Sequence, residues 1–397
     1  MDPRRILGTN CCILLSTLDN REQVVPYAPF PWVKTMRRIR PYFMMLTLIA
    51  FCIYWAELAP AQQTLSADRT DYVCDASYWL ATYRPSKTQY TASEMVASAN
   101  AFLDSLDEAQ KKQLLFDLSS DERRQWSNLP AIRRNTAGLR LGELNRQQLE
   151  SACQLMASLF SQQGYEKMRG IMLADDQLLN QGRPRDGFGT ENFYLCVFGT
   201  PSATQPWAFQ LDGHHIGVNV SVTGDQVTLA PSFIGTQPQT FQLGSQSLRP
   251  LTGEIDESYQ FINSLNDEQR IDAVQGKKRG RIITGPGQDG VTPPLKGLSC
   301  ASLKPAQKAI LLSLISQWVN DLPPPMAKQR MQEIEKEIDQ TRFIWNGEIE
   351  TGSDISYRIQ GPSIIIEYAC QDLGGDPQEH LHTMYRNPRD DYGGQLK

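Results

Sequence analysis

The fold of this chain is decided near its middle, in the segment WAFQLDGHHIGVNVSVT, residues 207–223. Apolar residues alternate there with polar or small ones, which predicts two strands, Trp207–Leu211 and His214–Thr223. Gly224-Asp225 is typical of a tight hairpin turn, so we expect Gln226–Ala230 to return beside them as another strand. The segment therefore predicts an antiparallel sheet, and it contains two of the four histidines of the chain.

Patterns typical of helices lie on both sides of this strand region. Five segments show them: residues 91–118, 146–181, 254–274, 304–321 and 325–340. A second strand region runs from Phe343 to Tyr368. We therefore predict an α+β fold, with helical segments packed around a mainly antiparallel β-sheet.

The pattern Ser-Leu-x-x-x-Gln occurs three times, at Ser105–Gln110, Ser264–Gln269 and Ser302–Gln307. It either marks a repeated unit or is a signal that recurs where helices begin. Because the residues downstream of the three copies do not match, we interpret it as a recurring helix-start signal.

The composition is that of an ordinary globular protein: of 397 residues, 40% are hydrophobic and 21% are charged. The formal net charge is -5, and residues 1–61 contain more Lys and Arg than Asp and Glu, so the rest of the chain is more acidic than the whole. An acidic body predicts no nucleic-acid partner, since contacts to phosphates need a basic face.

The N-terminus has the features of a targeting segment. Met36 to Arg40 is a basic start, residues 42–56 form an uncharged apolar run, and Ala59-Pro60-Ala61 offers a small-x-small cleavage pattern. Residues 36–61 are therefore expected to be a signal peptide, or alternatively a signal anchor that holds the chain in the inner membrane through residues 42–56. We expect an exported protein, periplasmic or extracellular, that contacts a membrane only through this segment.

These patterns divide the chain into four parts. Residues 1–35 precede the basic start and are interpreted as a misassigned N-terminal extension, and residues 36–61 are the signal peptide or signal anchor. Residues 62–92 have few periodic signals and are interpreted as a linker. Residues 93–397 are expected to form a single large α+β domain.

The four histidines fall in two short stretches, Gly213-His214-His215 and Glu379-His380-Leu381-His382. Side chains alternate along an extended strand, so the members of the second pair are expected on one side, where both imidazoles can bind one cation. On a regular strand the members of the first pair face opposite sides and only one is a ligand, whereas a bulge at the glycine brings both to one side. We predict that the two stretches meet at a shared metal or catalytic site; the alternative is four ordinary hydrogen-bonded residues in a half-buried sheet.

The predicted metal ligands are His214, His215, His380, His382 and Glu367. Three imidazoles with an open position are typical of catalytic zinc and of mononuclear copper or iron, so the residues predict a divalent metal ion without fixing its identity. Zinc favours hydrolysis by activated water, and copper or iron favours redox chemistry with oxygen.

Glu367 and Arg386 are the candidate catalytic residues. Glu367 follows the apolar run Ile364–Ile366, and a buried carboxylate needs a cation or a proton, so we expect a metal ligand or a general base. The alternative for Glu367 is an ion pair with an arginine such as Arg358. Arg386 is the candidate for holding an anionic substrate, with a role at the C-terminal surface as the alternative.

The pattern of these residues resembles a bacterial family named domain of unknown function 3500, many of whose members are exported. The landmarks that carry the resemblance are Trp126 with Pro130, Gly164-Tyr165, Tyr194 to Ser202, Trp207, Gly213-His214-His215, Tyr357 to Pro362, Ile366 to Tyr368, His380-Leu381-His382 and Arg386. They extend over most of the chain after residue 92, and the segment before Met36 lies outside them. The resemblance implies a common fold over that length and no established activity.

From the residues themselves we expect an exported metal-dependent enzyme with a poly-histidine site, a hydrolase or a metal-dependent oxidoreductase that acts on a small-molecule substrate. The alternative is a non-catalytic extracytoplasmic protein that binds a metal ion or another ligand. An enzyme keeps an exchangeable position on its ion, whereas a structural or storage site fills all positions.

Overall fold

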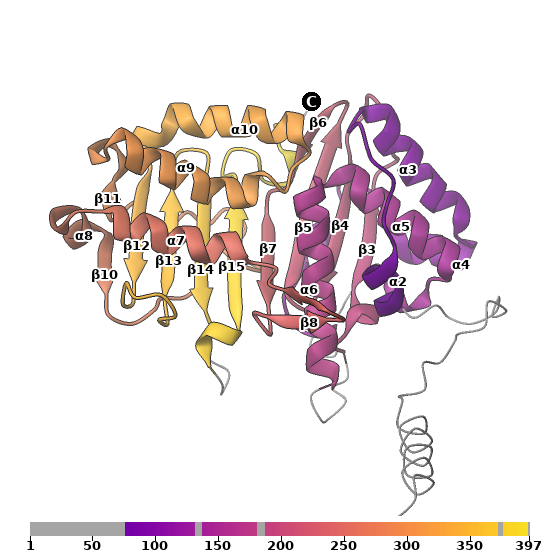
Figure 1. Ribbon diagram of the computed structural model, residues 1–397. Helices are drawn as coiled ribbons and strands as arrows, with labels where there is room; N and C mark the ends of the chain where they lie inside the picture. Colours follow the sequence, from indigo (N-terminus) through magenta and orange to yellow (C-terminus); the bar gives the residue numbers. More distant parts are fainter. Residues whose placement is uncertain (1–75, 132–136, 181–186, 372–375, 396–397) are drawn as a thin grey trace, which may run out of the picture. The chain divides into compact units, whose positions relative to one another are not determined.

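One large β-sheet forms the centre of the described part of the chain (Figure 1). This computed structural model describes residues 76–131, 137–180, 187–371 and 376–395. Within them the sheet has 13 strands, most neighbouring strands are antiparallel, and helices from both halves of the sequence lie over it in the view of Figure 1. The predicted α+β fold with a mainly antiparallel sheet is confirmed.

The helices and strands of the described part alternate in two similar series. The helices are α2 (Ala76–Thr82), α3 (Ala92–Ser105), α4 (Glu108–Leu114), α5 (Arg146–Leu159), α6 (Gln162–Asn180), α7 (Thr252–Ser264), α8 (Asp267–Ala273), α9 (Pro305–Val319) and α10 (Pro324–Glu337). The strands are β1 (Leu115–Phe116), β2 (Leu139–Arg140), β3 (Tyr194–Phe198), β4 (Trp207–Gly213), β5 (Ile216–Thr223), β6 (Gln226–Thr228), β7 (Ser232–Thr236), β8 (Phe241–Leu243), β9 (Gln246–Leu248), β10 (Val274–Gly276), β11 (Leu298–Ser299), β12 (Arg342–Asn346), β13 (Ser356–Gln360), β14 (Ile365–Cys370) and β15 (Leu381–Arg386). The main path through the sheet is β1-β3-β4-β5-β7-β15-β14-β13-β12-β10.

The predicted central hairpin forms, but its histidine pair lies in the turn. β4 and β5 pair as far as Gly213 with Ile216, so His214 and His215 are the two residues between the strands. Two-residue hairpin turns need positive φ angles, and His215 has a φ of 68°. The prediction that a strand begins at His214 is therefore wrong, and side-chain alternation along a strand does not decide where the two imidazoles point.

Matched capping boxes begin helices in the two halves of the chain. Nε2 of Gln148, in the first turn of α5, donates to Oε1 of Gln110 in α4 (2.8 Å) and to the last carbonyl of α3 (2.9 Å). Nε2 of Gln307, in the first turn of α9, donates to Oε1 of Gln269 in α8 (2.8 Å) and to the last carbonyl of α7 (2.9 Å). Both glutamine pairs are separated by 38 positions, which indicates that one helical unit occurs twice.

The strands repeat in the same way. The pairs β1·β3 and β10·β12 are parallel, β2·β3 and β11·β12 are antiparallel, and the meanders β3-β4-β5 and β12-β13-β14 are antiparallel. Their registers also match: Gln210 lies between Cys196 and Asn219, and Arg358 lies between Ile344 and Glu367. β7 and β15 pair antiparallel at the centre, so the two halves share one sheet through an approximate two-fold relation.

The three copies of the Ser-Leu-x-x-x-Gln pattern lie where helices begin, as we interpreted them, because Gln110, Gln269 and Gln307 complete the capping boxes of α4, α8 and α9. The pattern also marks a repeated unit, which we had not inferred. The copies at Ser105 and Ser264 end α3 and α7, which are equivalent helices of the two halves. The copy at Ser302 corresponds to Glu143–Gln148, where glutamate replaces the serine. The capping glutamines make the same contacts in both halves, and so do the serine hydroxyls that bond the carbonyls of Phe102 and Phe261. The segments between these matching positions have diverged, so the downstream sequence conceals the duplication.

A buried ion-pair cluster joins the helices of the two halves. Nζ of Lys167 on α6 lies 2.7 Å from the Glu254 carboxylate and 2.9 Å from the Asp321 carboxylate, and all three side chains are buried. Burial raises the pKa of Asp321 to about 6, while the charge of Lys167 opposes that rise. A Cβ atom at Gly164 would lie 2.6 Å from the Asp321 carbonyl oxygen, so this glycine permits the close contact and does not interrupt the helix.

The N-terminal predictions lie mostly outside the described residues. The extension 1–35, the signal segment 36–61 and the linker as far as residue 75 are among the residues that the structure leaves undescribed. The rest of the predicted linker includes α2, whose Ala76 and Leu80 are buried in the core, because its apolar residues recur at helical spacing. No helix in the described ranges is long and apolar enough to cross a membrane.

Candidate metal centre

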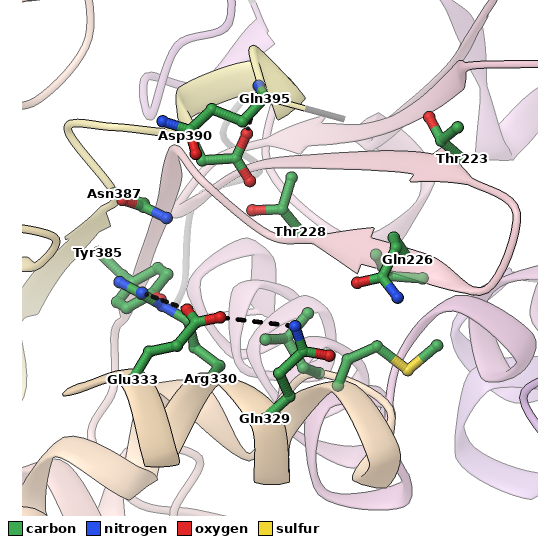
Figure 2. A pocket seen from close by; sticks show the side chains of 13 residues that line it. Thr223, Gln226, Thr228, Gln329, Arg330, Glu333, Tyr385, Asn387, Asp390 and Gln395 are labelled. Carbon is green, nitrogen blue, oxygen red and sulfur yellow. Dashed lines mark hydrogen bonds and ion pairs between the residues drawn. The ribbon is translucent and has the colours of Figure 1, made fainter. Parts of the chain in front are cut away.

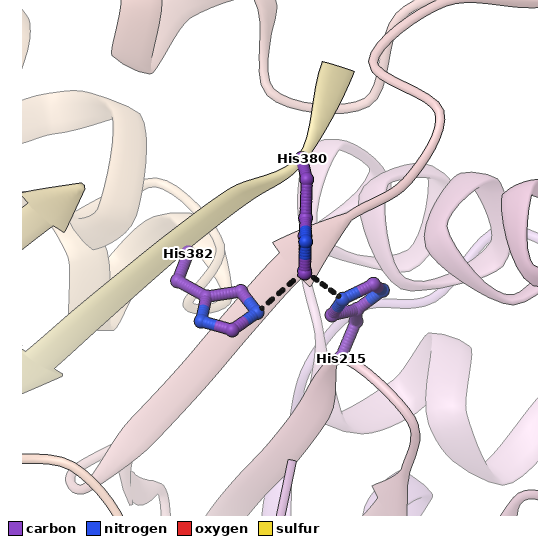
Figure 3. Close-up of side chains that lie close together, drawn as sticks. All are labelled: His215, His380 and His382. Atoms are coloured by element: carbon purple, nitrogen blue, oxygen red, sulfur yellow. Dashed lines mark hydrogen bonds between the residues drawn. The ribbon is translucent and has the colours of Figure 1, made fainter. Parts of the chain in front are cut away.

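Three imidazoles converge beside the central strands (Figure 3). Nε2 of His380 lies 2.8 Å from Nε2 of His215 and 3.0 Å from Nε2 of His382. His215 comes from the β4–β5 turn, His382 lies on β15 and His380 immediately precedes that strand. The structure thus brings together the two histidine stretches, although His215 and His380 are 165 positions apart in the sequence.

The two C-terminal histidines face one side, as their spacing predicts. His380 has an extended backbone (φ -133°, ψ 112°), and its carbonyl accepts a hydrogen bond from the backbone N of Gln371 (2.7 Å). His382 follows two residues later in register with Ala369. This pairing continues the β14–β15 ladder to His380, so both rings leave the backbone in the same direction.

Gly235 on β7 provides the space for two of the rings. It pairs with His382, and its N–H donates to the His215 carbonyl oxygen (2.7 Å). A Cβ atom at this position would lie 2.8 Å from Cδ2 of His382 and 3.1 Å from Cδ2 of His215. A residue with a side chain would therefore displace at least one of the two imidazoles.

The environment keeps the three imidazoles neutral. Burial, followed by the neighbouring histidines, lowers the pKa of His215 and of His382 well below 6.5. Burial, followed by the charges of His214 and Arg279, lowers the pKa of His380 to about 4. Neutral imidazole is the form that binds metal ions, so the ligands are ready for a cation at neutral pH.

The convergence fits a cation better than a hydrogen-bond network. Each Nε2 atom has one position in the plane of its ring, which holds either a hydrogen or a lone pair. Nε2 of His380 contacts both of the other Nε2 atoms, so it cannot donate to one and accept from the other. Lone pairs of all three nitrogens directed at one divalent ion satisfy them together, with metal–nitrogen distances of about 2.0–2.1 Å for zinc. The donor set therefore fits the predicted divalent ion.

His214 is paired with an aspartate beside this group. Its Nδ1 lies 2.5 Å from Oδ1 of Asp175 on α6, and Oδ2 of Asp175 accepts a hydrogen bond from the N–H of Gly189 (2.7 Å). The ring of His214 lies against that of His215, with centroids 3.7 Å apart, and Phe188 packs edge-on against it. Asp175, His214 and His215 form a second group whose ligand atoms lie within 4.8 Å of one another.

Asp175 is the site residue that the sequence analysis missed. It lies in α6 on the same stripe as Met168, Met172 and Leu178, all of which are buried. A carboxylate at an apolar position of an amphipathic helix needs a specific partner, and that was the available signal. The partner is His214, in a turn whose position relative to α6 only the tertiary structure reveals.

The structure does not bring Glu367 to the histidines. Its Oε2 accepts hydrogen bonds from Ile283 N (2.9 Å), Thr284 N (2.8 Å) and Thr284 Oγ1 (2.7 Å). Its Oε1 lies 3.7 Å from a guanidinium nitrogen of Arg358, the alternative partner that the sequence suggested. Glu367 thus holds the segment after β10 against the sheet, and neither group of potential metal ligands in the described residues includes it.

Arg386 likewise has structural partners. Its guanidinium contacts Asp391 (2.7 Å) and Asp289 (3.4 Å) and donates to the carbonyls of Thr284 and Gln288 (3.1 Å each). The side chain is 2% exposed, so an anionic substrate would have to displace these contacts. Arg386 therefore joins the C-terminal segment to the loop at 284–289.

Arg279 is a cation whose charge acts on the imidazole of His380. It belongs to the basic run Lys277–Arg281 after β10, and its charge contributes to the lowered pKa of His380. Its Nε lies 2.7 Å from the Asp354 carboxylate, and the side chain is 21% exposed. Three neutral imidazoles do not compensate the charge of a divalent ion. Arg279 adds further positive potential at the position between these imidazoles.

Comparisons with known proteins give one result that bears on this chain. No curated protein and no solved structure matches it significantly. A family model described as "Protein of unknown function (DUF3500)" matches residues 88–394, a range that contains all four histidines and Asp175. The chain therefore belongs to the DUF3500 family.

Proposed function

We propose that this protein is a metal-dependent enzyme whose divalent ion is held by His215, His380 and His382. The observation that carries the proposal is the approach of their three Nε2 atoms, at 2.8 and 3.0 Å, from two distant parts of the sequence. A bound divalent ion supplies Lewis acidity and lowers the pKa of water. Three protein ligands are the set typical of catalytic zinc, which keeps a further position for water or substrate.

The Asp175–His214 pair supports hydrolysis in particular. Asp175 fixes the ring of His214 through Nδ1, which leaves Nε2 of that ring to accept and return a proton. Such a carboxylate–imidazole pair is suited to general acid–base catalysis, which accelerates hydrolysis. We therefore favour a zinc-type hydrolase acting on a small molecule over a copper or iron oxidoreductase.

The competing function is non-catalytic metal binding. Burial favours it, because His215 is 1% and His380 is 4% exposed, as expected of a closed structural site. Cobalt substitution separates the two functions, since an open position changes the visible spectrum of the ion when azide is added. A site whose positions are all filled by protein leaves the spectrum unchanged.

Export is part of the proposal and rests on the sequence of residues 36–61. The basic start, the apolar run and the small-x-small pattern support a cleaved signal peptide, with an inner-membrane anchor through residues 42–56 as the alternative. N-terminal sequencing of the protein from fractionated cells tests it. A chain that begins near residue 62 in the periplasmic or extracellular fraction supports export, and an intact chain in the cytoplasm contradicts it.

The direct test of the metal site is elemental analysis of protein purified without a histidine tag. We expect a transition metal in a stoichiometric amount, lost in His380→Ala and in His382→Ala. Circular dichroism and thermal melting of the variants, compared with chelator-treated wild type, show whether the chain still folds. A wild-type protein that is folded and takes up neither zinc, copper nor iron would contradict the proposal.

A further inference from the structure

The duplicated sheet gives the metal centre a counterpart in the other half of the molecule. His382 pairs with Ala369 on β14, and Thr228 pairs with Ser221 on β5. Ala369 and Ser221 occupy the same register position in the two equivalent meanders. Thr228 therefore occupies the position that corresponds to His382.

The other two imidazoles have counterparts by the same reasoning. The Gln371–His380 backbone pairing beyond β14 corresponds to the pairing of Thr223 with Gln226 on β5 and β6. The β4–β5 turn that contains His215 corresponds to the β13–β14 turn that contains Ser363. Two hydroxyls and an amide thus replace the three metal-binding rings: Thr228, Gln226 and Ser363.

A pocket of about 430 Å³ opens at this counterpart position (Figure 2). Thr223, Gln226 and Thr228 line it from the strands, while Arg330 on α10 and Tyr385 on β15 line it from the other side. Its volume lies within the range of pockets that hold small molecules, about 300–1,000 Å³. The two halves therefore place a metal centre and a polar pocket at equivalent positions.

One hydroxyl in this pocket has no partner in the protein. Oγ1 of Thr223 is buried and makes no hydrogen bond, and the residue is 7% exposed. A buried hydroxyl without a partner is unfavourable by about 1–3 kcal/mol, so natural proteins rarely leave one unless a water or a ligand satisfies it. The oxygen itself is covered, while other atoms of Thr223 line the pocket, so rotation of this side chain would bring the hydroxyl to a ligand with a hydrogen-bonding group.

The charges of the lining exclude an anion. The charged residues around the pocket are Arg330, Glu333 and Asp390, one cation against two carboxylates. The guanidinium of Arg330 is already engaged by Glu333 (3.0 Å), by the hydroxyl of Tyr385 (3.1 Å) and by Ser363. An anionic ligand would therefore meet net negative charge and no available cation.

We propose that this pocket binds a neutral, hydroxyl-rich small molecule, a sugar or polyol. Threonine hydroxyls and the amides of Gln226 and Asn387 both donate and accept hydrogen bonds, as sugar hydroxyls do. Met326 and the ring of Tyr385 offer apolar surface for the C–H groups of such a ligand. The site is independent of the metal centre, so its ligand need not be the substrate.

Saturation-transfer NMR with maltose and with sorbitol tests the proposal, and gluconate serves as an anionic match for sorbitol. We expect saturable binding of at least one neutral compound, weaker binding of gluconate, and no difference between chelated and metal-loaded protein. Thr223→Val and Thr228→Val should each weaken binding about tenfold. Thr240→Val, a substitution at an exposed threonine that does not line the pocket, should leave binding unchanged.

Thr223→Val also separates a ligand-binding role from a structural one. Because its hydroxyl makes no hydrogen bond within the protein, the variant should melt no lower than the ligand-free wild type while losing affinity. Absence of saturable binding for both neutral compounds at concentrations of about 10 mM, or equal binding by wild type and both valine variants, would overturn the proposal.

Discussion

Gly235 faces His382 across the β7–β15 pair, and only hydrogen occupies the position where a side chain would meet the imidazole. Gly235→Ala places a methyl group 2.6 Å from the Leu381 carbonyl oxygen, 2.8 Å from Cδ2 of His382 and 3.1 Å from Cδ2 of His215, so the backbone of β15 and at least one ring must move. We expect metal affinity to fall at least about tenfold, although no ligand is changed. Competition with a chromophoric chelator measures it, and Gly285→Ala, whose added carbon makes only an ordinary 3.5 Å contact, is the control.

Acid should destabilise the metal-free protein. Burial in the folded state lowers the pKa of His380 from 6.5 to about 4, and it lowers the pKa values of His215 and His382 as well. Between pH 6.5 and 4 the unfolded chain therefore binds more protons than the folded one. Stability is therefore complete above pH 6.5 and is lost as the pH falls toward 4. At about 1.4 kcal/mol per pKa unit, His380 contributes no more than about 3.5 kcal/mol. Urea unfolding at several pH values between 4 and 6.5 measures this dependence. The free energy of unfolding should change less with pH in His380→Gln than in wild type, and an equal change would contradict the lowered pKa of His380.

Asp175→Asn tests the acid–base pair. The amide no longer holds His214 with a carboxylate, so we expect the zinc-loaded variant to hydrolyse p-nitrophenyl esters about 100-fold more slowly than wild type. Metal content should be unchanged, because Nε2 of His215, His380 and His382 remains in place. The neighbouring Asp176→Asn, which affects contacts to Thr190, is the matched variant. Similar rates for the two variants would argue against a role for the pair.

Glu367→Gln separates a structural carboxylate from a metal ligand. Its Oε2 accepts three hydrogen bonds from residues 283–284, and an amide placed there loses part of them. We expect the free energy of unfolding to fall by about 1–3 kcal/mol, with metal content unchanged. Glu350→Gln, at an exposed position, should change neither quantity. Loss of metal in a folded Glu367→Gln protein would restore Glu367 to the ligand set.

The parts of the fold that depend on local pattern could be predicted from the sequence. Apolar spacing predicted the helices and the meander around residues 207–223, and side-chain alternation along a strand predicted the common side of His380 and His382. The two-residue turn at His214 and His215 was not predictable from alternation, because residues other than glycine are uncommon where φ is positive and His215 has a φ of 68°. The clustering of all four histidines in two stretches was enough to predict their meeting, although the sequence does not encode their distance directly.

Long-range partners account for the predictions that the structure did not support. A buried carboxylate such as Glu367 needs compensating groups, but the sequence does not say whether these are a metal ion or the backbone of residues 283–284. Asp175 had the same ambiguity, and its partner is His214, which the sequence does not place beside α6. The internal duplication was missed because the residues that preserve it, such as Gln148 and Gln307, lie in short segments separated by stretches whose sequences do not match.

The pairing of β7 with β15 has a consequence for how such a chain can be divided. If the chain were cut after β9, β7 would become an edge strand of one fragment and β15 an edge strand of the other. An unprotected edge strand of this kind pairs readily with another strand. Two fragments made together would therefore find each other and rebuild the molecule, whereas one made by itself would self-associate.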